Sequence, residues 1–227
     1  MSNQITLNLQ KNISLNLTKD FTNLNRLTMR LGWDMAVAGR DWDLDSIAVA
    51  LDERGEIVKT IYFGDKNWSR NGIQLDKDNL TGEGEGADEN IFVQLDKVPA
   101  NVVKIGFFAN IYNAGRRDFS GVKNAFINIT DNDTGREIAI YHLNEDGKGF
   151  NAFHFGSLDK VNGEWLFTPI GEGTNGSVNT VATTFSKQVK ASLGITQEEK
   201  PKITKQENQS PQEQPQKKKG FFGRFFS

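Results

Sequence analysis

Val102-Val103-Lys104-Ile105-Gly106-Phe107-Phe108-Ala109-Asn110-Ile111 is apolar almost without interruption. A strand with one solvent-exposed face alternates apolar and polar residues, whereas a strand covered on both faces is a nearly continuous apolar run. Val98-Pro99-Ala100 separates this stretch from the segment before it. We therefore expect residues 102–111 to form a central strand with both faces covered.

Strand candidates continue on both sides of this stretch, most of them with apolar residues at every second position. Residues 5–9 and 13–17 flank Gln10-Lys11-Asn12 and are expected to form a hairpin. With about ten short strands and almost no helical periodicity, the sequence predicts an all-β fold. We expect a β-sandwich of two mostly antiparallel sheets, in preference to a barrel, with acidic ion-binding loops at one end. The other candidates are residues 27–33, 47–51, 57–63, 91–95, 125–129, 137–141, 153–158 and 163–167.

Two acidic loops interrupt the strand pattern. The first is Asp41-Trp42-Asp43-Leu44-Asp45-Ser46, with aspartate at every second position, and the second runs from residue 76 to 89 around Gly82, Gly84 and Gly86. Carboxylates at this density repel one another unless a cation cancels their charge. Ca²⁺ takes about six to eight oxygen ligands, which flexible acidic loops supply. The two loops therefore predict oxygen-only coordination of Ca²⁺, with the ion bridging them.

Other interpretations of the acidic and glycine-rich segments fit less well. The first loop is not an EF-hand, because Ser46 stands where that loop has its glycine and Asp52 where it has its bidentate glutamate. The second loop lacks the Gly-Lys-Ser/Thr of a phosphate-binding loop. Residues 131–135 favour a hairpin turn over a third ion site.

Catalysis is the less favoured class of function. Asp43-Leu44-Asp45 resembles the paired aspartates of phosphoryl-transfer hydrolases, but those follow an apolar strand, and Ala38-Gly39-Arg40 precede this pair. A paired-carboxylate glycosidase stays open, because the separation of two carboxylates is a property of the three-dimensional structure. His142 and His154 lie in strands that read as half-buried and are expected to be structural. We therefore expect a binding protein and not an enzyme.

The composition sets further bounds. The 227-residue chain has no cysteine, which excludes disulfides and thiolate metal sites. It also has no apolar run of about 18 residues and no N-terminal signal-peptide pattern, so a cytoplasmic location is expected. Residues 1–185 carry 18 Lys/Arg against 25 Asp/Glu, a net charge of −7. An acidic body repels phosphate backbones, so no nucleic-acid partner is expected.

The composition changes near residue 186. We expect a folded domain over residues 1–185 and a disordered polar linker over 186–216, because the latter holds too few apolar residues to form a core. Residues 217–227 then read Lys217-Lys218-Lys219-Gly220-Phe221-Phe222-Gly223-Arg224-Phe225-Phe226-Ser227. Exposed phenylalanine side chains on a disordered segment favour aggregation unless they are buried against a partner or a membrane. We expect Lys217–Phe226 to dock on a partner protein or on the anionic surface of the inner membrane.

Taken in order, these pieces resemble the TerD-domain family of tellurite-resistance and calcium-binding stress proteins. The resemblance runs from about residue 5 to 173, and the second acidic loop is its most specific part. It implies a β-sandwich that binds two Ca²⁺ ions through the acidic loops. The segments that carry the resemblance are Leu31–Asp34, Asp41–Ser46, Asp78–Glu89, Asn124–Ile127 and Asn162–Trp165.

The resemblance also implies which residues hold the ions. Ala87 departs from the family pattern, because it stands where an aspartate is usual and cannot coordinate. Water or Glu85 can take its place, so we expect one of the two sites to be weakened. Asn113 likewise stands where relatives often carry an acidic residue. The implied ligands are Asp34, Asp43, Asp45, Asp78, Asn79, Thr81, Glu83, Asp88 and Glu89.

The sequence therefore predicts a Ca²⁺-binding stress-response protein of the tellurite, chemical or phage resistance type. It is expected to act as a binding or scaffold module, tethered by its tail to membrane or partner. The alternative is a calcium-independent adaptor that docks through the Phe-rich tail, with acidic loops that are merely solvated.

Overall fold

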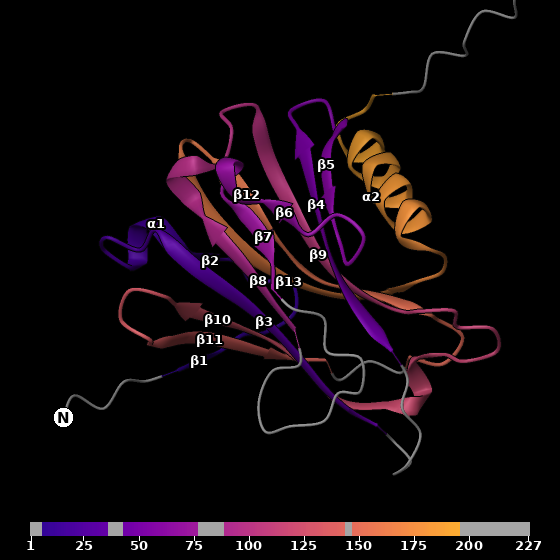
Figure 1. Cartoon of the computed structure of the whole chain (residues 1–227). Helices are drawn as coiled ribbons and strands as arrows, with labels where there is room; N and C mark the ends of the chain where they lie inside the picture. Colours follow the sequence, from indigo (N-terminus) through magenta and orange to yellow (C-terminus); the bar gives the residue numbers. More distant parts are fainter. Residues whose placement is uncertain (1–5, 36–42, 77–88, 144–146, 196–227) are drawn as a thin grey trace, which may run out of the picture. The chain divides into compact units, whose positions relative to one another are not determined.

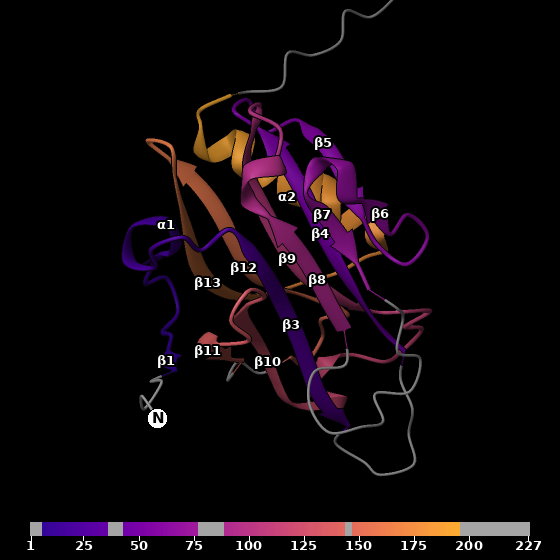
Figure 2. The ribbon, with the colours of Figure 1, turned by 60° about the vertical axis from the view of Figure 1, so that its left-hand side comes forward.

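The computed structural model of the chain describes residues 6–35, 43–76, 89–143 and 147–195 (Figure 1). Within these ranges the chain forms two sheets, which Figures 1 and 2 show as the two layers of a sandwich. All strand pairs are antiparallel except β1 with β11. The predicted all-β sandwich of two mostly antiparallel sheets is confirmed.

The seven-stranded sheet has the order β1-β11-β10-β3-β8-β7-β6. Its strands are β1 (Leu7–Asn8), β11 (Glu137–His142), β10 (Val122–Asp131), β3 (Arg26–Met35), β8 (Glu89–Gln94), β7 (Ile73–Leu75) and β6 (Asn67–Trp68). The six-stranded sheet has the order β2-β13-β12-β9-β4-β5. Its strands are β2 (Leu15–Asn16), β13 (Glu164–Thr174), β12 (Ala152–Val161), β9 (Val102–Ile111), β4 (Leu44–Asp52) and β5 (Ile57–Ile61).

Short helical segments join or cover these strands. They are α1 (Leu17–Asp20), the 3-10 turns η1 (Ser69–Asn71), η2 (Leu95–Lys97) and η3 (Phe119–Gly121), and the longer α2 (Val178–Ser192). None of the helices in the described ranges is long and apolar enough to cross a membrane.

Strand β9 occupies the position that its sequence predicts. It lies between β12 and β4 in the six-stranded sheet, and one face, with Ile105 and Phe107, packs in the core between the sheets. The other face, with Phe108, packs beneath α2. Both faces are therefore covered, which explains the nearly continuous apolar run.

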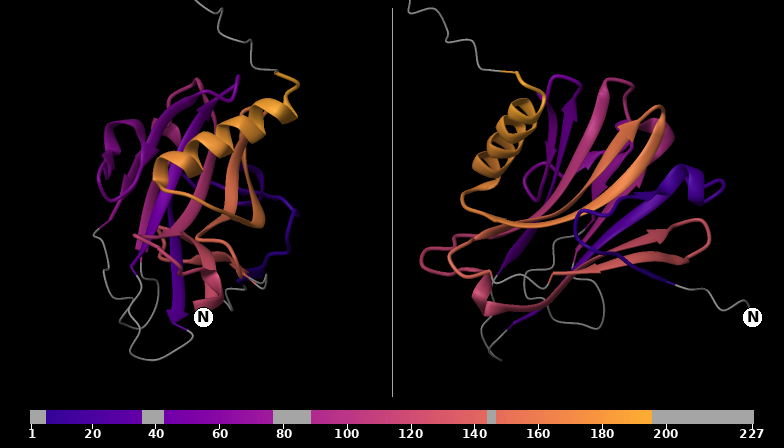
Figure 3. Two further views of the ribbon diagram at one scale, coloured as in Figure 1. Left: turned by 90° about the vertical axis from the view of Figure 1, so that its right-hand side faces the viewer. Right: turned by 180° about the vertical axis from the view of Figure 1, so that it is seen from behind.

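Helix α2 crosses the outer face of the six-stranded sheet (Figure 3). The ring centroid of Phe185 lies 5.2 Å from that of Phe108 and 5.0 Å from that of His154. A Cβ on Gly106 would lie 2.7 Å from atoms of Phe185, so glycine is needed there for the helix to approach β9. The C-terminal half of the helix is tied to the β4–β5 turn, because Ser186 Oγ donates to the carbonyl of Gly55 at 2.5 Å.

The helix corrects two expectations. Almost no helical periodicity was expected in the sequence, but the apolar residues of 178–189 follow helical spacing at positions 178, 181, 182, 185 and 189. The predicted start of the linker at residue 186 is too early, since the helix continues to Ser192 and buries Ser186. The rest of the predicted linker, from residue 196, lies outside the described ranges.

The predicted N-terminal hairpin is wrong. Strand β1 pairs with β11 in one sheet, and β2 pairs with β13 in the other. The residues between β1 and β2 bind β13 instead of forming a hairpin turn. The amide of Asn12 donates to the carbonyl of Pro169 at 2.8 Å, and Lys11 Nζ donates to the carbonyl of Gly171 at 3.0 Å. The segment between the two short strands thus passes from one sheet to the other.

The expected hairpin turn at residues 131–135 is confirmed. Residues 52–56 turn β4 into β5, and residues 131–135 turn β10 into β11. Trp33 and Trp165 are buried in the core, as their places on alternating strands predict.

Candidate functional site

The strand ends that border the two acidic loops lie at one end of the sandwich. In the seven-stranded sheet the pairing of Leu31 with Glu89 and of Leu75 with Ile91 sets the end of β3, the end of β7 and the start of β8 beside one another. The start of β4 in the facing sheet joins them through the amide of Ser46, which donates to Glu89 Oε2 at 2.5 Å. The fold therefore gathers residues that are more than forty positions apart.

Glu89 is the buried carboxylate at this end. It is 1% exposed, and it alternates with Ile91 and Val93, which belong to the core between the sheets. The side chain therefore points between the sheets, where its contact with Ser46 links β8 to β4. Ser46 is fully buried, and its Oγ makes no hydrogen bond with any described residue. Buried oxygens normally have a partner, so this one fits a position beside a bound cation or water.

Asp45 is almost fully buried, at 2% exposed, but on the other face of β4. Side chains alternate along a strand, and Ala48 belongs to the inter-sheet core whereas Ile47 packs beneath α2. Ser46 therefore faces the core, and Asp45 faces the side of α2, next to its cross-strand neighbour Asn110. The buried carboxylates of Asp45 and Glu89 thus lie on opposite sides of β4, the first as part of that strand and the second facing it from β8.

Asp43 and Asp34 occupy more exposed positions. Asp43 is half-buried, and its carbonyl accepts a hydrogen bond from the amide of Tyr112 at 2.8 Å, which continues the β4–β9 pairing. Asp34 is exposed near the end of β3, and its Oδ2 accepts a hydrogen bond from Asn124 Nδ2 at 2.7 Å. That contact joins β3 to β10.

The remaining predicted ligands, Asp78, Asn79, Thr81, Glu83 and Asp88, lie outside the described ranges, together with Asp41 and Ala87. Within the described ranges no three His, Asp or Glu side chains converge closely enough to hold an ion by themselves. The described oxygens of Glu89, Asp45 and Asp43 suit a hard cation, because carboxylate oxygens are the ligands that Ca²⁺ prefers. With Asp34, they are the predicted ligands that the structure describes.

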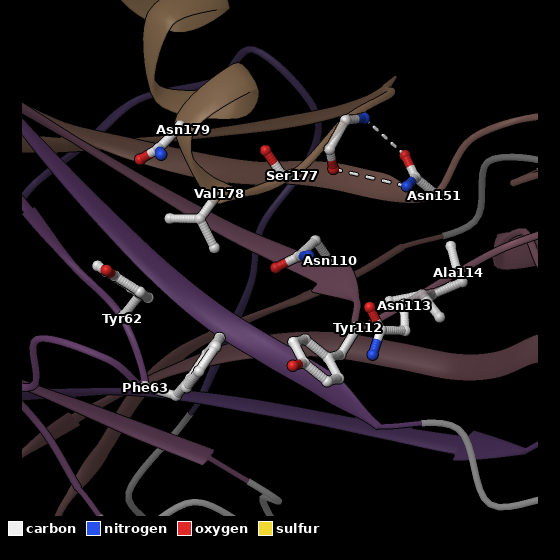
Figure 4. A pocket seen from close by; sticks show the side chains of 12 residues that line it. Tyr62, Phe63, Asn110, Tyr112, Asn113, Ala114, Asn151, Ser177, Val178 and Asn179 are labelled. Carbon is white, nitrogen blue, oxygen red and sulfur yellow. Dashed lines mark hydrogen bonds between the residues drawn. The ribbon is translucent and has the colours of Figure 1, made fainter.

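A second feature is a cavity of about 350 Å³ beside the start of α2 (Figure 4). Its walls come from the end of β5, the end of β9 and the residues before and after the start of α2. Asn110, which is 4% exposed, lines it. Sequence reasoning missed this cavity, since its residues come from well-separated segments that share no motif.

The two histidines differ in environment. His142 is exposed, whereas His154 is 8% exposed and stacks on Phe108 with 4.2 Å between ring centroids. Burial, and to a smaller extent the charge of Lys104, lower the pKa of His154 to about 3. Its Nε2 lies 2.9 Å from Ser157 Oγ. His154 is thus a neutral structural residue, as its place in a strand predicts, whereas His142 is more exposed than expected.

His154 makes the stability of the domain depend on pH. The unfolded chain takes up a proton near pH 6.5, but the folded chain resists protonation down to about pH 3. The stability that neutral His154 contributes is present above pH 6.5 and is lost as the pH falls through this window, at up to about 1.4 kcal/mol per pH unit. We expect His154→Gln to flatten urea-unfolding free energies between pH 6.5 and 4.5.

The matched control is His142→Gln, at the exposed histidine. It should keep the pH dependence of the unmodified chain. Equal slopes for the two variants would show that His154 is not protected from protonation.

Comparison with known proteins gives a consistent result. The model of the TerD domain family matches residues 5–185. General stress protein 16U of Bacillus subtilis (strain 168) is 38% identical over 192 residues, covering 82% of this chain and 100% of that protein. Tellurium resistance protein TerD of Serratia marcescens is 34% identical, covering 80% and 97%. The crystal structure of a homologue of telluride resistance protein (TerD) from Streptomyces coelicolor A3(2) superposes with a TM-score of 0.61 at 20% identity, covering 72% and 98%, which supports the fold.

Proposed function

The chain belongs to the TerD domain family, whose members include tellurium-resistance and stress proteins, and on this premise we propose that it is a Ca²⁺-binding stress-response protein. It acts as a binding or scaffold module and not as an enzyme. The observation that carries the proposal is the carboxylate of Glu89, buried between the sheets and held by the amide of Ser46 at the base of both acidic loops.

Electrostatics supports a cation at this end. An ionised carboxylate is costly to bury unless its charge is compensated, and Glu89 and Asp45 are both nearly inaccessible to solvent. Both belong to strands that border the loops, which bring further carboxylates. A divalent cation would supply the opposite charge and bridge β4 to β8. The binding of such an ion adds directly to the free energy of unfolding.

The placement of the carboxylates supports two ions in preference to one. Glu89, on β8, lies against the core face of β4, whereas Asp45 lies on the face of β4 toward α2. Together with half-buried Asp43, they would supply the described ligands, and the family pattern implies that Asp78, Asn79, Thr81, Glu83 and Asp88 complete the set. Asp34 stays a predicted ligand, and its Oδ2 also accepts a hydrogen bond from Asn124 Nδ2.

Titration of the chelator-stripped chain with Ca²⁺, and then with Mg²⁺, tests the proposal. We expect two saturable Ca²⁺ binding events by calorimetry, one weaker because of Ala87, with little competition from Mg²⁺. At a Ca²⁺ concentration of about 100 times Kd the stabilisation is about 2.7 kcal/mol, or roughly 5–10 °C in Tm. No binding heat and no change in Tm would refute the proposal.

The C-terminal tail is a separate matter. Lys217–Phe226 lies outside both the described ranges and the family match. Its docking on a partner protein or on the inner-membrane surface, and with it a cytoplasmic location, stay predictions. They do not bear on the calcium proposal, which concerns residues 43–89.

A further inference from the structure

The cavity at the start of α2 has a composition unlike that of the acidic end. Asparagine, serine and aromatic side chains line it, and none of its lining residues is charged. Its volume of about 350 Å³ falls within the roughly 300–1,000 Å³ that is typical of small-molecule sites. The cavity therefore suits a ligand whose enclosed part is neutral and polar.

Asn110 is the buried polar group that points to a ligand. Its side chain is 4% exposed, and its Oδ1 accepts no hydrogen bond from any described residue. Figure 4 shows its amide between the start of α2, at Ser177 and Val178, and the rings of Phe63 and Tyr112. A buried acceptor without a partner costs about 1–3 kcal/mol. A hydroxyl or amino group of a ligand in the cavity would relieve that cost.

The start of α2 supplies donors to the same cavity. Ser177, Val178 and Asn179 all line it, and the first backbone amides of a helix have no partner within the helix. Ser177 occupies the N-cap position, but its side chain makes no capping hydrogen bond. The helix has 15 residues, so its N-terminus carries a partial positive charge that favours an anion.

Aromatic rings form another wall. Phe63 lies edge-on to Tyr62, at 5.3 Å between ring centroids, and edge-on to Tyr112, at 5.4 Å. Tyr112 keeps 42% of its surface exposed. Such rings give a planar ligand a surface to stack on, and the base-to-aromatic stacking of nucleotides is worth about 1–3 kcal/mol per base.

A cationic hollow of about 290 Å³ adjoins the cavity and shares Asn151 and Gly176 with it. Arg116 and Arg117 line this hollow, and neither guanidinium makes an ion pair with a described residue. Arginine forks bind phosphate through paired hydrogen bonds. Asp118 also lines the hollow.

Hydrogen bonds hold the junction of the two hollows in place. Asn151 Oδ1 accepts from the amide of Gly176 at 2.8 Å, and the amide of Asn151 donates to Asn175 Oδ1 at 3.0 Å. Asp118 Oδ2 accepts from the amide of Gly149 at 2.8 Å, while its Oδ1 accepts from Ser120; these bonds, the contact with Ser120 first, lower the pKa of Asp118. Its charge therefore organises the loop, at the cost of some repulsion toward a phosphate.

We propose that the two adjoining hollows bind a nucleoside monophosphate. The base would stack on Tyr112 with its edge toward Phe63, since the two rings are nearly perpendicular. A hydroxyl or amino group would donate to Asn110 Oδ1, and the phosphate would lie between the arginines and the start of α2. The base, the polar group and the phosphate of this ligand thus match the aromatic wall, the buried acceptor and the cationic hollow, respectively. The cavity borders the acidic end, because Asn110 is the cross-strand neighbour of Asp45, but the contacts proposed here use none of the predicted Ca²⁺ ligands, so this proposal does not depend on the calcium proposal.

Calorimetric titration of the full chain tests the assignment, with chelator present so that no divalent cation contributes. The probes are the four ribonucleoside 5′-monophosphates, adenosine and inorganic phosphate. We expect at least one monophosphate to bind at least about tenfold more tightly than either adenosine or phosphate, because only it engages both hollows. No heat with any of the four up to millimolar concentration would overturn the proposal.

Variants separate the two halves of the site. Arg116→Gln/Arg117→Gln should weaken monophosphate binding at least about tenfold and leave adenosine unaffected, whereas Tyr112→Ala should weaken both. Arg54→Gln/Arg70→Gln is the matched control, because it removes the same charge at two other exposed arginines. If the two arginine pairs behave alike, or if adenosine binds as well as its monophosphate, the phosphate assignment is wrong.

Discussion

Replacing Phe185 by alanine is expected to lower the free energy of unfolding by about 3–5 kcal/mol, the range for a buried phenylalanine. Phe185 is 4% exposed and is the central contact between α2 and the six-stranded sheet. Its ring packs on Phe108 and on His154, and it approaches β9 where Gly106 leaves room. The truncated side chain would leave a cavity that these rings cannot fill.

Urea unfolding followed by tryptophan fluorescence measures this effect. Lys187→Ala is the control, since Lys187 is exposed on the same helix and should change stability by less than about 0.5 kcal/mol. A loss below about 1 kcal/mol for Phe185→Ala would mean that the helix is not docked on β9.

Glu89→Gln is expected to abolish most of the stabilisation contributed by the Ca²⁺ ion that Glu89 binds, without weakening the ion-free fold. The amide oxygen of glutamine can still accept the hydrogen bond from the amide of Ser46, so the link between β8 and β4 is kept. The substitution removes a buried negative charge next to an acidic segment, which relieves repulsion when no cation is present. We therefore expect Tm in chelator to stay the same or to rise.

With Ca²⁺ the expectation reverses. Loss of one charged ligand should weaken binding about 100-fold, since ligand charge sets Ca²⁺ affinity. At a Ca²⁺ concentration 100 times the original Kd, stabilisation then falls from about 2.7 to about 0.4 kcal/mol. Glu172→Gln, at an exposed carboxylate on β13, is the control and should keep the full shift in Tm. An undiminished shift in Glu89→Gln would remove Glu89 from the ion site.

Most strands could be predicted because each depends on the local order of apolar and polar residues. Alternation identified the half-buried strands, and the apolar run of residues 102–111 identified the strand covered on both faces. The helical spacing of residues 178–189 was an available signal that the sequence analysis overlooked. The N-terminal hairpin failed for another reason, because strands of two residues gain more from long-range pairing than from each other.

Local sequence patterns could not predict which side chains meet in the candidate sites. The acidic loops and the family resemblance followed from the sequence, since they depend on which residue types occur at which spacing. That Ser46 and Glu89 meet, and that Asp45 turns to the opposite face of β4, depends on how the two sheets and α2 pack. The cavity around Asn110 brings together segments far apart in the chain. The strands, the family and the acidic composition of the two loops follow from the sequence alone. Which side chains lie together depends on the tertiary structure, because packing and not spacing along the chain sets the distances between remote residues.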